Sequence, residues 1–348
     1  MKKIALFLLV VIITSCSRKH QVTFNPSFGN ELKTDFISSS IIKSDMDCRY
    51  PIKLALLDSI FVVQDLGGDK LIQLYDLSGN YLSCLVKQGD APNEIPNLTS
   101  TFSVENNKIV VYSTPKIAEY DPFKYLNAEK DFCFSHKVSD KLFSLPVHCV
   151  RKFNDSYFLE GFTDQMRFAL FDKDSSLYVY KEYPQIIANA SSEKIAQVMS
   201  YASKIAFSPD KRYWIQGSYI GGTLEIFQWE NNEIASIKQI FIYPPVFEDM
   251  EAMVSWGNDT TIGVDDMYAT SNYIYIVLNG TQGANLKSAS PVDPFSNKIM
   301  VLDWQGNLVR KIETDCMIMA LTVDPTDQFC HVVSFEAENG YALRKISL

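Results

Sequence analysis

The chain has 348 residues, of which 47% are hydrophobic and 21% charged, and its formal net charge is -9 at pH 7. This acidic balance argues against a protein that binds nucleic acid or adheres directly to an anionic membrane surface, because both functions need a basic patch. The length allows one large domain or two ordinary ones, and the 18 Tyr and 22 Phe residues favour β structure.

The N-terminus has the order of a secretory signal peptide. Lys2 and Lys3 form a basic start, residues 4–13 form an apolar run, and a small-residue junction ends at Cys16. The apolar run is too short to cross a bilayer. The alternative interpretation is that these residues form a buried strand of the fold. We predict a signal peptide over residues 1–15.

The junction resembles the lipobox of bacterial lipoproteins, in which the cysteine becomes the lipidated first residue of the mature protein. We therefore expect a lipid on Cys16 that anchors the protein in the outer membrane. A polar tether over residues 16–35 and a folded body over residues 36–348 would follow. The residues directly after the cysteine lack the acidic run associated with surface export, which favours the periplasmic side and leaves surface exposure open.

One pattern recurs through the body. A hydrophobic β-like run ends in an acid, a polar turn follows, and a second β-like run begins, with two further strand-like runs ahead of each pair. A repeat of roughly 40 to 50 residues built from short β runs is typical of a propeller, with one blade per unit. The hairpins lie at residues 71–85, 117–134, 168–183, 224–240 and 298–312, and their acids are Asp76, Asp121, Asp172, Glu230 and Asp303.

A single helix interrupts the β pattern at residues 191–201. Ser191 or Ser192 can cap its N-terminus, and Ile195, Val198 and Met199 share one face. We expect this face to pack against the propeller, with a partner-binding helix as the alternative.

The last unit is truncated, and residues 36–43 can supply its missing outer strand. Such a closure removes the free sheet edges at the two ends of the ring. We predict an all-β fold, a six-bladed β-propeller whose N-terminal strand closes the last blade, with one short inserted helix. Seven blades and a two-sheet sandwich are the alternatives.

The cysteines other than Cys16 do not lie at a motif spacing, and most sit in apolar runs. We expect buried free thiols, although an oxidising compartment also permits disulfides.

The long connections should gather on one face of the ring. In a four-stranded meander, the links between blades and those from second to third strand emerge on the same side. These links include residues 89–98, 184–202, 243–262 and 280–297. Because loops on a rigid scaffold commonly carry function, we expect the binding face there. The candidate residues are Asp90, Asn93, Glu94, Tyr201, Glu248, Asp249, Glu251 and Trp256.

Catalytic motifs are missing from the sequence. The four histidines are scattered, and no H-E-x-x-H, G-x-S-x-G, P-loop or paired C-x-x-C is present. We therefore nominate no catalytic, cofactor-binding or metal-binding residue.

Several segments together resemble the TolB-like six-bladed β-propeller lipoproteins of Gram-negative bacteria. The run YDLSGNYLSCL is followed by QGDAPNEI, which is similar to a G-x-G-P-G-E loop at Gly89, Pro92 and Glu94, with Ala91 and Asn93 in place of two glycines. Residues 204–214 and 265–280 add to the likeness. The resemblance implies a propeller that acts as a binding or interaction module, and it carries over no catalytic residue.

Two functions stay open at this point. The first, which the sequence favours, is a non-enzymatic, lipid-anchored envelope propeller that binds a protein, peptide or glycan without a cofactor. The alternative is a calcium-dependent propeller hydrolase or lactonase, which needs several Asp, Asn or Glu ligands from different blades to converge on the axis.

Overall fold

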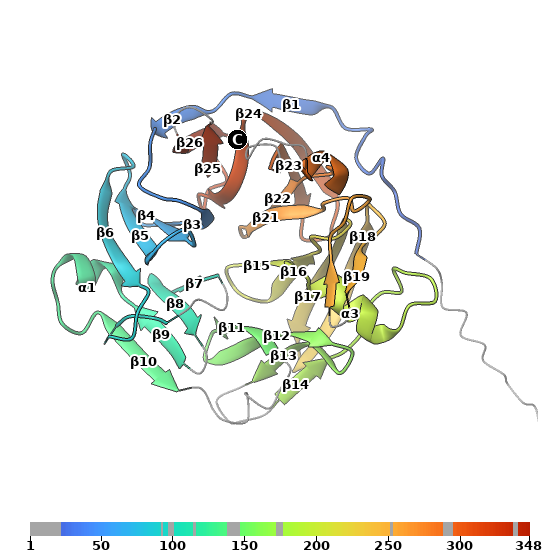
Figure 1. Cartoon of the computed structure of the whole chain (residues 1–348), viewed down its shortest axis with the longest axis horizontal. Helices are drawn as coiled ribbons and strands as arrows, with labels where there is room; N and C mark the ends of the chain where they lie inside the picture. The colour runs from blue at the N-terminus through green and yellow to red at the C-terminus, as the bar shows by residue number, and fades with distance from the viewer. Residues whose placement is uncertain are drawn as a thin grey trace, which may run out of the picture.

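The computed structural model describes residues 22–91, 93–96, 101–113, 116–137, 147–171, 177–250, 253–287, 295–336 and 340–348. Within these ranges antiparallel β-sheets stand side by side around a central axis (Figure 1). The chain is an all-β propeller with few helices, as the sequence predicts.

Four of the sheets have four strands each, and in every one the first strand lies nearest the axis (Figure 1). The first sheet contains β3 (Pro51–Leu57), β4 (Ile60–Asp65), β5 (Lys70–Asp76) and β6 (Tyr81–Lys87). The second contains β7 (Ser103–Glu105), β8 (Lys108–Ser113), β9 (Lys116–Tyr120) and β10 (Cys133–Lys137). The third contains β11 (Val147–Phe153), β12 (Ser156–Thr163), β13 (Met166–Phe171) and β14 (Leu177–Tyr180). The fourth contains β15 (Lys204–Phe207), β16 (Tyr213–Gly217), β17 (Thr223–Glu230) and β18 (Glu233–Phe241).

The largest sheet in the described ranges has eight strands, and one long strand connects its two halves. The N-terminal part of β24 (Leu308–Val323) pairs with β23 (Ser296–Asp303), and its C-terminal part pairs with β25 (Phe329–Glu336). At the far end β2 (Ser40–Lys43) runs antiparallel to β26 (Gly340–Ser347), and β1 (Thr34–Ile37) runs parallel to β24. The other members are β21 (Val264–Ala269) and β22 (Tyr273–Leu278), and a separate hairpin is formed by β19 (Glu248–Met250) and β20 (Met253–Ser255).

Each pair of neighbouring sheets buries its own hydrophobic core. The first sheet packs on the second through residues such as Val62 and Val111. The third and fourth sheets share an aromatic cluster centred on the fully buried Trp214. The first sheet also packs against the end of the eight-stranded sheet, where Phe61 meets Val333. The cores therefore follow one another around the ring.

Two hairpin turns of the repeat have the same hydrogen bonds. Asp76 Oδ1 accepts from the backbone N–H of Asn80 at 2.8 Å, and Asp303 Oδ1 accepts from that of Asn307 at 2.8 Å. In both turns the second carboxylate oxygen accepts from the asparagine side chain. A glycine with a positive φ, as at Gly79 (75°), completes each Asp-x-x-Gly-Asn sequence. These local bonds explain why the repeat is visible in the sequence.

The other acids of the repeat have different roles. Asp121 caps a helix, as described below, and Glu230 forms an exposed ion pair with Arg212 at 3.1 Å. The turn after Glu230 is made by Asn231 and Asn232, which both have a positive φ. Asp172 lies outside the described residues.

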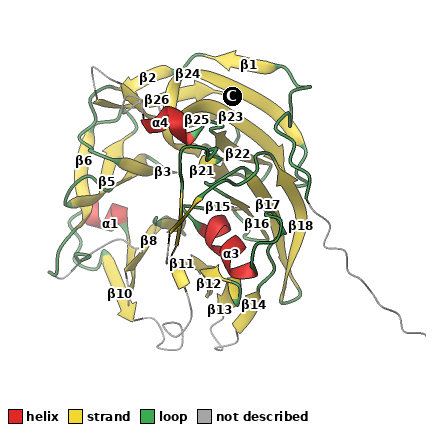
Figure 2. Ribbon diagram, turned by 45° about the vertical axis from the view of Figure 1, so that its right-hand side comes forward, coloured by secondary structure: helices red, strands yellow, loops and turns green. Residues whose placement is uncertain are grey.

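Three short helices lie in the described ranges, whereas the sequence predicted one (Figure 2). The expected helix is α3 (Ser192–Ser200), which is capped by the Ser191 side chain and buries Ile195, Val198 and Met199. The prediction of a single helix was wrong, because it missed α1 (Pro122–Leu126) and α4 (Gly283–Lys287). Helix α1 replaces a simple turn because Asp121 accepts hydrogen bonds from two backbone N–H groups and Pro122 is suited to the first helical position.

The buried face of α3 does not rest on a four-stranded sheet alone. It packs with Val254 of β20 and with Ile220 in one cluster, and Val22 and Phe24 of the N-terminal segment border this cluster. The apolar face of this helix is therefore buried inside the fold, as the sequence predicted.

The N-terminal segment contacts the body earlier than residue 36. The backbone N–H of Asn25 donates to the carbonyl of Phe241 at 2.8 Å, and Phe28 borders the core between the fourth and eight-stranded sheets. Described residues of the segment expected to be a tether therefore already contact the body. Cys16 lies outside the described residues.

In the described ranges the six cysteines beyond Cys16 form no disulfide with one another. Four of them are buried, and burial raises the pKa of thiols such as Cys330.

Candidate functional site

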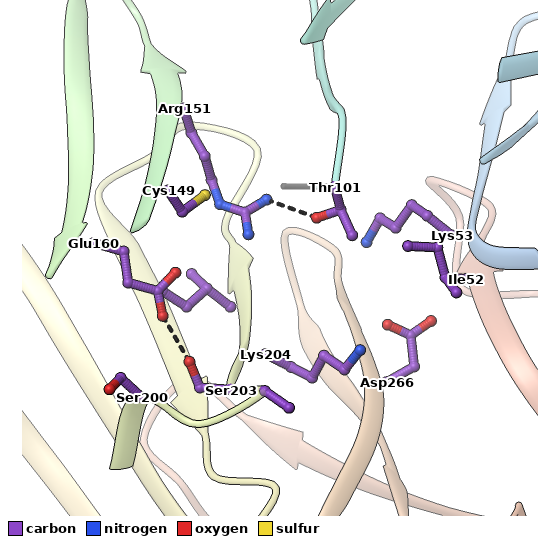
Figure 3. Close-up of a pocket in the computed structure, with 12 residues that line it drawn as sticks. Ile52, Lys53, Thr101, Cys149, Arg151, Glu160, Ser200, Ser203, Lys204 and Asp266 are labelled. Atoms are coloured by element: carbon purple, nitrogen blue, oxygen red, sulfur yellow. Dashed lines mark hydrogen bonds between the residues drawn. The ribbon is translucent and has the colours of Figure 1, made fainter. Parts of the chain in front are cut away.

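A polar cavity of about 160 Å³ lies on the propeller axis, enclosed by the innermost strands (Figure 3). Its walls come from β3, β11, β12, β15 and β21, together with Thr101, which precedes β7. The C-terminal end of α3 and the link to β15 form one side, through Ser200 and Ser203. The connection between the third and fourth sheets therefore reaches the axis, as a between-blade link should.

Three cationic side chains from three sheets point into this cavity (Figure 3). Lys53 comes from β3, Arg151 from β11 and Lys204 from the first position of β15. Arg151 Nη1 donates to Thr101 Oγ1 at 3.3 Å, and its buried Nε has no hydrogen-bond partner among the described residues. In the part of the chain that the structure describes, neither lysine has a carboxylate within 4.0 Å of its ammonium.

The surroundings disfavour the charged form of Lys53. Burial lowers the pKa of this lysine, the carboxylate of Asp266 opposes that effect, and the charges of Arg151 and Lys204 lower the pKa further. The cations are close enough to repel one another, so the free cavity is electrostatically costly.

The acids of the cavity already have hydrogen-bond donors. Asp266 Oδ2 accepts from the backbone N–H of Leu321 at 2.9 Å, which joins the inner strand β21 to the C-terminal part of β24. Glu160 Oε1 accepts from Ser203 Oγ at 2.6 Å and from the Gln216 side chain at 3.4 Å. Their charges offset the three cations only in part.

Next to Asp266 on strand β21, the carboxyl group of Asp265 lies beside the cavity. Asp265 accepts a hydrogen bond from Asn279 Nδ2 at 2.8 Å. Burial raises the pKa of Asp265 to about 7, although this hydrogen bond and the charge of Lys204 act in the opposite direction. This carboxyl group therefore changes its charge near neutral pH.

The axial cavity continues toward the opposite face. A second cavity of about 380 Å³ shares Lys53, Arg151 and Ile205 with the first and is bordered by the first turn of several sheets. There the Lys211–Glu105 ion pair occupies one wall. Lys53 and Arg151 thus lie at the junction of two axial spaces.

The candidates from the sequence fall in other places. Asp90, Asn93 and Glu94 line a separate cavity of about 560 Å³ beside β9, where Tyr120 Oη donates to the Asn93 carbonyl at 3.3 Å. The positive φ of Asn93, 70°, suits an asparagine in place of the family glycine. These three residues form one group.

A second group of candidates lies around α3 and the β19–β20 hairpin. Asp249 pairs with Lys194 of α3, and the Tyr201 ring lies 6.3 Å from that of Tyr219. Glu248 is exposed, and Trp256 is half-buried beside the start of α4. Glu251 lies outside the described residues. Tyr201 lies beside the axial cavity, because its neighbours Ser200 and Ala202 line that cavity.

The sequence reasoning missed the axial cations. Their signal is a charged side chain within or at the start of the first strand of a four-strand unit, as in PIKLALL and KIAF. Such a residue interrupts the apolar pattern of an innermost strand. The lengths of the connecting loops, from which the candidate residues were chosen, carry no information about it.

The donor set of the axis does not fit calcium. Calcium takes six to eight oxygen ligands, whereas the axial cavity presents three cations and two carboxylates that already accept hydrogen bonds. Among the described residues no group of three or more His, Cys, Asp or Glu side chains is placed to hold a metal ion.

Comparison with known proteins establishes the family. Residues 30–326 match the family described as TolB-like 6-blade propeller-like, and the chain belongs to this family. No curated protein matches the sequence. None of the helices in the described ranges has the length and apolar character needed to cross a membrane.

Solved structures share the fold at low sequence identity. A protein of Bacteroides fragilis, provisionally described as exported, is 11% identical with a TM-score of 0.52, over 90% of this chain and 99% of the other. A gluconolactonase from Xanthomonas campestris is 12% identical with a TM-score of 0.51, over 88% of each chain. The WD40 repeats of RRP9 are 8% identical with a TM-score of 0.51, over 89% and 97%. These likenesses concern the fold alone.

Proposed function

We propose that this protein is a lipid-anchored binding module of the cell envelope, and that it recognises a protein, peptide or glycan at the mouth of the axial cavity. The observation that carries the proposal is the axial cavity itself, in which polar side chains from several sheets converge. Among the described residues, no group of three or more His, Cys, Asp or Glu side chains is placed to hold the metal ion that a calcium-dependent hydrolase requires.

The proposed anchor is a lipid on Cys16, after removal of residues 1–15. Its support is the order of basic start, apolar run and small-residue junction in the sequence. Because bacterial lipoproteins carry two or three acyl chains, such an anchor would hold the propeller stably at the outer membrane, with the periplasmic side favoured. The resulting closeness of the propeller to the membrane makes envelope components its natural ligands.

We also propose six blades, with β2 closing the last one. The eight-stranded sheet then counts as two blades that share β24. Support comes from the core that Val277, Val301 and Val332 form between its two halves, as between separate blades. A rigid closed ring would keep the axial side chains in fixed positions, because it leaves no free edge to fray.

The alternative is a calcium-dependent hydrolase or lactonase. The fold resembles that of a gluconolactonase, but at 12% identity this likeness does not assign an active site to the present chain. Three cations at the centre of the ring would repel calcium, which makes binding without a metal the better-supported function.

The experiment is capture from detergent-solubilised envelopes with the mature chain, in calcium and in chelator. We expect one component to be retained in both conditions by the wild type and by Lys238→Met, which changes an exposed residue of β18. The Lys204→Met variant should no longer retain this component. Retention that disappears in chelator, or calcium-dependent thermal stabilisation without any captured component, would support the hydrolase instead.

A further inference from the structure

We propose that the axial cavity is an oxyanion site, in which Lys53, Arg151 and Lys204 bind a carboxylate or phosphate group. The inference takes from the proposed function only that the cavity is where the ligand enters, and it names the chemical group that the cavity recognises.

The charge of the cavity is the first argument. Three basic side chains face two carboxylates in the cavity wall, Asp266 and Glu160. The carboxyl group of Asp265 beside the cavity is only partly ionised at neutral pH, because burial raises its pKa to about 7. Basic groups therefore outnumber acidic groups in the wall. The protein as a whole carries a formal charge of -9, so this positive site does not follow from a basic composition. Basic side chains gathered in one cavity concentrate ligands of the opposite charge there.

The unused hydrogen-bond donors are the second argument. Within the described part of the chain, the Arg151 side chain makes one long hydrogen bond, to Thr101 at 3.3 Å, and its buried Nε has no partner. A guanidinium presents its N–H groups in a planar fork that matches carboxylate and phosphate oxygens. Across the cavity, no carboxylate of the described residues lies within 4.0 Å of either lysine ammonium group, and each lysine would add a single charge-assisted bond to a bound anion.

The size of the cavity limits what can enter. An engineered protein cavity of about 150 Å³ accommodates benzene, a molecule of six heavy atoms. The axial cavity, at about 160 Å³, therefore holds one anionic group and a few attached atoms, and the rest of a larger ligand would remain at the mouth.

The cost of the free state distinguishes a binding site from a structural cluster. Burial and neighbouring cations lower the pKa of Lys53, so an anion that neutralises the cavity should stabilise the folded protein. Removing one cation should also stabilise the free protein, whereas removing a structural ion-pair partner would destabilise it.

The test measures binding of small probes to the mature chain by calorimetry and by thermal unfolding at constant ionic strength. Glycolate and glycolamide have the same number of heavy atoms and differ in charge, and inorganic phosphate is the third probe. We expect glycolate or phosphate to bind and to raise the midpoint of unfolding, and glycolamide to do neither. Which anion binds more tightly distinguishes a carboxylate ligand from a phosphate ligand.

Variants connect the effect to the cavity. Lys53→Met should weaken anion binding at least tenfold, or about 1.4 kcal/mol, and should raise the melting temperature of the free protein. Lys204→Gln should weaken binding to a similar degree, and it provides the test if the first variant does not fold. Lys238→Met should bind as the wild type does.

Failure of both glycolate and phosphate to bind more tightly than glycolamide, or unchanged anion binding in both axial variants, would overturn the oxyanion site. If anions fail to bind while the envelope component is still captured, this inference fails and the binding module stands. If anions bind but no envelope component is captured, the site stands and the proposed function fails.

Discussion

The buried ion pair between Arg167 of β13 and Glu225 of β17 should be a major contributor to the stability of the ring. Both side chains are fully buried, and Arg167 Nη1 lies 2.7 Å from Glu225 Oε2. Arg167 also donates twice to Gln216 Oε1, at 3.0 and 2.7 Å, and once to the Glu182 carbonyl at 3.0 Å. One guanidinium thus connects the third sheet to the fourth.

The perturbation is Arg167→Met, which keeps most of the side-chain volume and removes the charge. Glu225 Oε1 would retain its donors from Ser236 and Gln239, but Oε2 would remain buried without a cation. Breaking a buried pair in this way costs about 3–5 kcal/mol of the free energy of unfolding. Adding Glu225→Gln removes the stranded charge, so the double variant should recover about 2 kcal/mol or more relative to the sum of the single losses.

The assay is urea unfolding followed by tryptophan fluorescence. Trp214 is a local probe, because it is fully buried and stacks on Phe227 with 5.4 Å between ring centroids. Arg212→Met is the matched control, since its partner Glu230 is as exposed as Arg212 itself and such pairs contribute about 0–1 kcal/mol. A loss from Arg167→Met no larger than that of the control, or strictly additive single effects, would refute the reasoning.

Three further predictions concern pH and backbone geometry. The pKa of Asp265 is about 7 in the folded protein and about 4 when unfolded. The free energy of unfolding should therefore fall by at most about 4 kcal/mol as pH rises from about 4 to 7. Asp265→Asn should abolish this fall in urea titrations across that range. Burial, followed by the charge of Lys345, lowers the pKa of His331 to about 4, so stability is lost as pH falls from about 6.5 to 4, and His331→Leu should remove about 3 kcal/mol of that acid sensitivity. Gly79→Ala should cost at least about 1 kcal/mol, because a Cβ there would lie 2.4 Å from Lys43 Cβ on β2. It should cost more than Gly340→Ala, which has a similar positive φ but open space around it, and equal losses would mean that β2 is not held against this turn.

Much of the local structure follows from the sequence alone. The Asp-x-x-Gly-Asn turns at Asp76 and Asp303 depend on hydrogen bonds within five residues, so their repetition is readable without coordinates. The same holds for α3, whose cap and buried face are local, and for the alternating strands of the sheets. Even α1 was accessible, because the Asp121–Pro122 pair is a local start signal that the hairpin pattern concealed.

The site was decided by the tertiary structure. The sequence indicated long connections, and the residues chosen on them fall into two groups, neither of which lines the axial cavity. Lys53, Arg151 and Lys204 are about 50 to 150 residues apart along the chain, and they meet because the packing of successive sheets brings the inner strands to one axis. That geometry depends on the twist of every sheet and on the cores between them, which no local pattern of residues encodes. The strands were therefore determined by nearby residues, and the charged centre by the assembly of the ring as a whole.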